Sequence, residues 1–175
     1  MAHARLGDVP GCGLTLPADS AATDRRVNAS AECLHVYAEV AGFASQHLPL
    51  LQLHQLTVDA YGAQHGGGGV PPIRLAYSLV GLYLALEHGL TGDDVRSAHQ
   101  RMGKPDATWP TFPAPRDIGP LTVMTVADEG LMSRSESGHR AAVQRWAKEV
   151  WRAWRDEHEM VAALTGRLLP DLVGR

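Results

Sequence analysis

The sequence predicts an all-α protein, a helical bundle of about five to six helices that follows an irregular N-terminal segment. Three observations lead to this prediction. Apolar residues recur at steps of three and four through most of the chain after residue 29. Helix-starting and helix-ending residues bracket these stretches. A length of 175 residues with 45% hydrophobic residues fits one packed domain. We therefore divide the chain into residues 1–29, which show no clear period, and a helical bundle domain over residues 30–175.

The first two helices follow from their end signals. Ser30 is a favourable N-cap for a helix over residues 31–48, and Cys33 falls on the apolar stripe of that helix. A proline suits the first turn of a second helix, over residues 49–65. Four consecutive glycines, residues 66–69, end this helix, because glycine enters left-handed conformations freely.

The third helix is expected at the centre of the bundle. Two prolines open it, it covers residues 73–88, and its middle, LAYSLVGLYLAL, is apolar on all sides. A fourth helix is expected over residues 92–102, because Thr91 and Asp94 resemble a capping box.

The C-terminal half combines a long connection with the clearest helix. Prolines recur through residues 103–120, which predicts an extended loop, and long loops often cover a site. Trp109 and Phe112 would be its lid residues. Residues 121–132 suit a short strand or a short helix, and a threonine followed three residues later by an aspartate favours the helix. A broad apolar face rich in tryptophan predicts one helix over residues 138–169.

Composition narrows the functional classes. The 16 basic and 19 acidic residues give a formal net charge of −3, and no basic stripe with interleaved aromatic residues is present. Nucleic acid is therefore not an expected partner. No apolar run reaches the roughly 20 residues that cross a bilayer, so a membrane is not expected either. The N-terminus lacks the apolar core of a signal peptide, which favours a cytoplasmic location. A reducing compartment argues against a disulfide between Cys12 and Cys33.

The segment HQLTVDAYGAQHGGGG, residues 54–69, is the most informative stretch for function. It combines His54, Asp59, Tyr61 and His65 on one predicted helix. The two histidines are 11 residues apart in the chain, which is roughly 16 Å along a helix, so they cannot share one metal ion.

Two interpretations of these side chains stay open. In a catalytic site, Asp59 or His65 would be the general base and Tyr61 would orient a substrate. In a purely structural role, Asp59 would make a buried hydrogen bond or a salt bridge, for example to Arg74, and His65 would cap its helix.

The two cysteines are candidate metal ligands. Cys12 lies in a PGCG turn, where glycines allow amide groups to face a thiolate, as in a metal knuckle. A complete knuckle has the spacing CxxC, and the matching position here is Val9. Cys33 lies near a helix start, where the helix dipole lowers a thiol pKa. Both cysteines equally suit the role of small buried hydrophobic residues.

The order of these motifs resembles a bacterial family known as a domain of unknown function. The resemblance spans residues 11–154 and is most specific at VDAYGAQH. The motifs that carry it are PGCG, the pair Glu32–Cys33, HQLTVDAYGAQH, PPIRLAYSLVGLYLALEHG and WAKEVWRAW. The matching candidate residues are Cys12, Cys33, His54, Asp59, Tyr61, Gln64 and His65.

The resemblance brings no reaction with it, but it implies a comparison. Members of the family begin with a CxxCG knuckle, and some carry a histidine before the helix that starts with Glu-Cys. This chain has Val9 in place of the first cysteine and Asp24 near the histidine position. If the family binds zinc through its knuckle, this chain has lost at least one ligand.

The leading hypothesis is a cytoplasmic protein that binds a transition metal near Cys12, Cys33 and His54. Thiolate and imidazole ligands favour zinc over magnesium or calcium. The metal would either brace the N-terminal loop or act as a Lewis acid toward a small molecule.

Two alternatives remain. One is a metal-free enzyme or ligand-binding bundle for a small molecule. Its pocket would lie between the helix over residues 49–65, the central helix and the tryptophan face, under the proline-rich loop. The other is an interaction or scaffold protein, whose tryptophan helix buries against a partner or a second copy in a homodimer.

Overall fold

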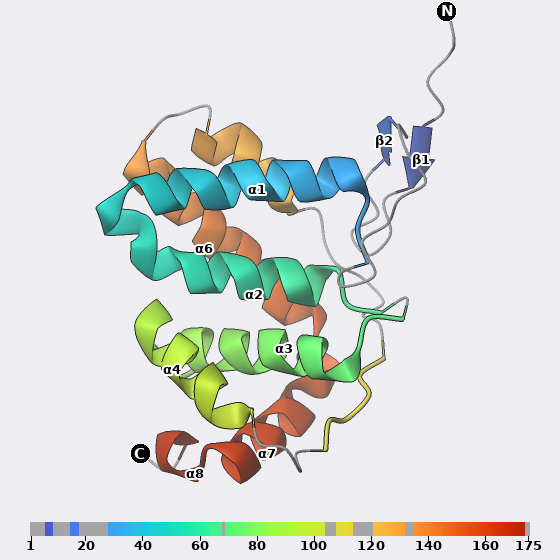
Figure 1. Ribbon diagram of the computed structural model, residues 1–175, viewed down its shortest axis with the longest axis vertical. Helices are drawn as coiled ribbons and strands as arrows, with labels where there is room; N and C mark the ends of the chain where they lie inside the picture. The colour runs from blue at the N-terminus through green and yellow to red at the C-terminus, as the bar shows by residue number, and fades with distance from the viewer. Residues whose placement is uncertain are drawn as a thin grey trace, which may run out of the picture.

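The computed structural model describes residues 6–8, 15–17, 28–67, 69–103, 108–113, 121–131 and 135–173. The described part is an all-α bundle, which confirms the predicted fold class, with one short two-stranded hairpin beside it (Figure 1). The longer helices are α1 (Ala31–Gln46), α2 (His54–Gln64), α3 (Pro72–Leu86), α4 (Gly92–Met102), α6 (Glu136–Ala153) and α7 (His158–Leu168). The short helices are α5 (Val123–Val126), with a π-helical turn over Ala127–Leu131, and α8 (Pro170–Val173).

The first three long helices lie side by side in chain order (Figure 1). The N-cap prediction for α1 is confirmed, because Ser30 Oγ accepts a hydrogen bond from the backbone N–H of Cys33 at 3.2 Å. The predicted second helix begins instead with a 3-10 turn, Leu48–Leu53, before α2 starts at His54. A proline at position 49 suits such a tight first turn. After α2, Gly67 and Gly69 have φ angles of 101° and 91°, which a residue with a Cβ rarely adopts.

The helix α3 lies at the centre of the bundle, as its apolar sequence predicts. Its buried residues include five consecutive positions from Ser78 to Leu82, so it is covered on several sides. Its neighbours are α2, α4, α6 and α7. The capping box at the start of α4 is confirmed, since the Thr91 hydroxyl accepts from the backbone of Asp94 while the Asp94 carboxylate accepts from the backbone of Thr91.

The single long C-terminal helix predicted over residues 138–169 is interrupted. The chain leaves α6 at Trp154, makes a 3-10 turn over Arg155–Glu157, and continues as α7. Tertiary contacts explain the interruption: the Trp154 indole donates to the Ala63 carbonyl at 3.1 Å, and the ring of His158 stacks on Trp151 at 3.7 Å. The hydrogen bond from Trp154 to Ala63 joins residues that are 91 positions apart, so residue periodicity does not report it.

The N-terminal segment, expected to be irregular, contains an antiparallel hairpin. Strands β1 (Leu6–Asp8) and β2 (Thr15–Pro17) pair so that Leu6 faces Pro17 and Asp8 faces Thr15. Strands of three residues are too short for an alternating pattern to show in the sequence. None of the helices in the described ranges is long and apolar enough to span a membrane.

Candidate functional site

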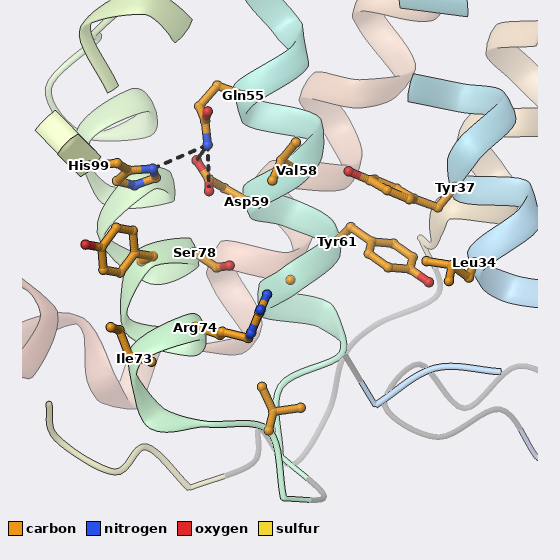
Figure 2. A pocket seen from close by; sticks show the side chains of 13 residues that line it. Leu34, Tyr37, Gln55, Val58, Asp59, Tyr61, Ile73, Arg74, Ser78 and His99 are labelled. Atoms are coloured by element: carbon orange, nitrogen blue, oxygen red, sulfur yellow. Dashed lines mark hydrogen bonds between the residues drawn. The ribbon is translucent and has the colours of Figure 1, made fainter. Parts of the chain in front are cut away.

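A cavity of about 560 Å³ opens between α1, α2, α3 and α4 (Figure 2). Its walls are largely apolar, and polar side chains from α2, α3 and α4 are gathered on one side. The apolar part is lined by Leu34, Val58, Val70 and Ile73. The polar part is lined by Gln55, Asp59, Arg74, Ser78 and His99. An apolar cavity with a few convergent polar groups is typical of a small-molecule site.

Asp59 lies on the floor of this cavity, with only 2% of its surface exposed. Both carboxylate oxygens accept from the Gln55 side-chain amide at 3.1 Å. Gln55 precedes Asp59 by four residues, so both project from the same face of α2. Burial raises the pKa of Asp59 well above its ordinary value, and the hydrogen bond from Gln55 opposes this rise only in part.

Two small residues on α2 and α3 make room for this arrangement. A Cβ at Gly81 would lie 2.1 Å from Oδ2 of Asp59, and a Cβ at Gly62 would lie 2.3 Å from Oγ of Ser78. Glycine at both positions therefore lets the two helices approach closely enough to bury the carboxyl group between them.

His99 on α4 completes the polar side of the pocket. Its Nδ1 lies 3.4 Å from the Gln55 side-chain nitrogen, so Gln55 stands between the imidazole and Asp59 (Figure 2). Burial lowers the pKa of His99 to about 4. Its Nε2 is buried and has no hydrogen-bond partner in the described part of the chain. Burial thus favours the uncharged forms of both His99 and Asp59.

Tyr61 separates the pocket from a second group of polar side chains. Its ring lines the pocket and stacks on Tyr37 at 4.1 Å, and its hydroxyl donates to Sγ of Cys33 at 3.6 Å. The Tyr37 pKa is raised by burial and by the charge of Asp59. On the far side of Tyr61, Sγ of Cys33 lies 3.3 Å from Nε2 of His65, and both residues are fully buried.

The hydrogen bonds fix the tautomer of His65. Its Nδ1 lies 2.9 Å from the Tyr61 carbonyl oxygen, which can only accept, so Nδ1 carries the proton. Nε2 therefore presents a lone pair to Cys33, which can accept a hydrogen bond from the thiol or bind a metal ion. His65 does not line the pocket that contains Asp59 and Tyr61.

The structure does not bring Cys33 and His54 together. Cys33 contacts His65 just beyond the C-terminal end of α2, whereas His54 is the first residue of α2, roughly 16 Å away along the helix axis. Cys12, the third residue of the sequence-predicted metal site, lies outside the described residues. Within the described ranges, no group of three or more His, Cys, Asp or Glu side chains is arranged to hold a metal ion.

The remaining candidates of the VDAYGAQH segment differ in role. Gln64 is fully buried and structural: its amide donates to the Leu121 carbonyl at 3.0 Å and accepts from the Trp146 indole at 2.9 Å.

Arg74 lines the pocket and forms no ion pair with Asp59, so the salt bridge considered from the sequence is absent between these two described residues. Gln55, Ser78 and His99 were not predicted, although a glutamine one helical turn before Asp59 is a signal that points to Gln55.

The tryptophan face is covered by the chain itself. Trp146 and Trp154 hydrogen-bond to α2, and the Trp151 indole donates to Glu87 at 2.7 Å. The pocket lies on a different face of α2 from these tryptophans, between α1 and α4. In the loop predicted to act as a lid, Phe112 is buried against Trp154, and Trp109 contacts Tyr77 at the edge of the pocket.

Fold and site together define an all-α bundle with a pocket that has a buried carboxyl group at its floor. A family of unknown function (DUF5946) matches residues 7–155. The chain belongs to this family, which confirms the resemblance found in its motifs. No curated protein and no solved structure matches the chain.

Proposed function

We propose that this protein binds a small organic molecule in the pocket between α1, α2, α3 and α4, with Asp59 as its main polar contact. The observation that carries this proposal is the buried Asp59 carboxyl group at the floor of a cavity of about 560 Å³. A cavity of this size suits a drug-sized or smaller ligand.

The environment of Asp59 supports an acid–base role toward that ligand. Its raised pKa keeps the carboxyl group protonated closer to neutral pH than an exposed aspartate, so it can donate as well as accept a hydrogen bond. Strong pKa perturbation inside a cavity is typical of functional sites. The proposal includes a cytoplasmic location, where Cys33 stays a reduced thiol.

A fragment screen by ligand-observed NMR tests the proposal. Ile73 lines the pocket and is 40% exposed, so Ile73→Trp fills the entrance with little expected loss of stability. Leu48 is 81% exposed and does not line the pocket, which makes Leu48→Trp the matched control. We expect fragments that bind the wild type and Leu48→Trp but not Ile73→Trp. Equal binding by all three proteins, or no binding by any, would count against the pocket.

A second candidate function is metal binding, which one distance favours. Sγ of Cys33 and Nε2 of His65 are 3.3 Å apart, a spacing that two ligands of one tetrahedral zinc ion can adopt. We propose Cys33 and His65 as protein ligands, in place of the Cys33–His54 pair. Two ligands are fewer than the three or four of known zinc sites. Cys12 remains a third candidate ligand on sequence grounds alone.

Elemental analysis of tag-free protein tests this second candidate. We expect zinc in the wild type, loss of zinc in Cys33→Ala and in His65→Ala, and retention in His54→Ala, because His54 lies at the other end of α2. A Cys12→Ala variant reports whether that residue contributes. A wild type without metal, or zinc that only His54→Ala removes, would overturn the assignment to Cys33 and His65.

A further inference from the structure

The pocket contains two groups of opposite charge that do not pair with each other. Asp59 lies on its floor, and Arg74 of α3 lines the same cavity and is exposed to solvent. Figure 2 shows Arg74 extending from α3 toward α2, below Asp59. The Asp59 carboxylate is held by the neutral Gln55 amide, and no ion pair of either residue is found among the described residues.

Tyrosine rings form much of the remaining wall. Tyr37, Tyr61 and Tyr77 all line the cavity, and the first two are stacked on each other with their ring centres 4.1 Å apart. Tyr37 and Tyr61 cover each other's ring faces, so this part of the wall is an apolar aromatic surface. Such a surface suits the carbon chain of a ligand, and its charged ends are left to Asp59 and Arg74.

The charges of Asp59 and Arg74 determine which charged groups a ligand of this pocket should carry. A buried carboxylate without a cationic partner is costly, and an ammonium group inside the cavity would stabilise its charged form. A purely cationic ligand would be repelled by Arg74. A guanidinium matches a carboxylate in both charge and geometry, so Arg74 favours an acidic group on the same ligand.

We propose that the pocket binds a small zwitterion, with its ammonium group at Asp59 and its carboxylate at Arg74. This inference rests on the proposed function and names the ligand class for the same site. The ligand is an amino acid in the broad chemical sense, an amine and an acid joined by a short carbon chain.

Binding of an ammonium group at Asp59 also displaces a proton. The unliganded Asp59 retains a proton to higher pH than an exposed aspartate, whereas an ammonium group pairs with the ionised carboxylate. At any pH where Asp59 of the free protein is protonated, binding therefore releases that proton into the buffer. Calorimetry in two buffers that differ in ionisation enthalpy measures this release directly.

The probes share a six-carbon chain and differ in the charged groups at its two ends. They are ε-aminocaproate as the zwitterion, hexylamine as the cation and hexanoate as the anion, with shorter and longer ω-amino acids from γ-aminobutyrate upward to find the best length. We expect the best zwitterion to bind at least tenfold more tightly than the amine or the acid of equal length. Its binding should release a proton.

Single substitutions test which residue binds each end of the ligand. We expect Asp59→Asn and Arg74→Gln each to weaken zwitterion binding about tenfold or more, and Asp59→Asn to abolish proton release. The controls Asp156→Asn and Arg155→Gln change the same residue types in the exposed 3-10 turn after α6, and should leave binding unchanged. Thermal unfolding of every variant verifies that it is folded.

Failure of this inference is distinguishable from failure of the proposed function. If pocket-specific fragments bind but no ω-amino acid does, or if hexylamine binds as tightly as the best zwitterion, the zwitterion assignment is wrong and the pocket stands. If neither fragments nor amino acids distinguish the wild type from Ile73→Trp, both are wrong.

Discussion

Gly81 on α3 faces Asp59 on α2 so closely that a Cβ at position 81 would lie 2.1 Å from Oδ2 of the carboxyl group. The buried carboxyl and the missing side chain are therefore parts of one arrangement. Because Gly81 has no side chain, α2 and α3 approach each other closely, and the Asp59 carboxyl group fits between them at the floor of the pocket.

Gly81→Ala should destabilise the protein, because the added methyl group displaces the Asp59 carboxyl or pushes α3 away from α2. We expect a loss of about 1–3 kcal/mol in the free energy of unfolding by urea, the usual cost of overpacking. Gly166→Ala in α7 is the matched control: a Cβ there meets no atom within 4 Å, and alanine should stabilise the helix by up to about 1 kcal/mol. Equal effects of both substitutions would contradict the close contact.

Asp59→Asn should make the protein more stable than the wild type at neutral pH. The folded-state pKa of Asp59 is raised, so its stabilising contribution is complete below the ordinary value of 3.8 and is lost as the pH rises through the folded-state pKa. Asparagine does not ionise, so the difference in unfolding free energy between variant and wild type should grow with pH from 4 upward. A difference that is independent of pH would contradict the raised pKa.

His99→Gln should change the pH profile in the opposite direction. Burial lowers the pKa of His99 from 6.5 to about 4, so its contribution is present above pH 6.5 and is lost as the pH falls toward 4. The loss in the wild type is about 3 kcal/mol across that range. The variant should lack most of it, as measured by urea unfolding at several pH values. The same experiment on His35→Gln, which changes an exposed side chain, shows whether burial is the cause.

Gln64→Met should destabilise the fold without altering the pocket. The substitution removes the acceptor of the buried Trp146 indole N–H and the donor to the half-buried Leu121 carbonyl. We expect a loss of about 1–3 kcal/mol in the unfolding free energy, most of it from the indole N–H, which is left buried without a partner. Fragment affinity of the folded variant should stay unchanged, because Gln64 does not line the cavity. Lost affinity with unchanged stability would assign Gln64 to the site instead.

Local signals explain why most of the fold could be predicted from the sequence. Ser30 and the pair Thr91 and Asp94 act within one helical turn of the helix that they begin, and their roles are found in the structure. The interruption at Trp154 could not be predicted, because it depends on a hydrogen bond to Ala63, 91 residues earlier in the chain. The apolar period simply continues across that point.

The candidate site could also be predicted only in part, because some of its contacts join residues that lie far apart in the chain. Asp59 and Tyr61 stand out on α2, and both line the pocket. His99 on α4 contacts Gln55, which lies 44 residues earlier in the chain, and no local sequence pattern indicates this contact. The pairing of Cys33 with His65 likewise spans 32 residues. Helical geometry already separated His65 from His54, but it could not tell which of the two histidines meets the thiol.

The carboxyl ¹³C resonance of Asp59, followed by NMR against pH and against a pocket fragment, tests the central claim most directly. If Asp59 is the buried polar contact of a ligand pocket, its titration midpoint lies well above 3.8, and fragments that Ile73→Trp excludes shift its resonance. A midpoint near 3.8, with no response of this resonance to any fragment that binds the protein, would contradict the proposed function.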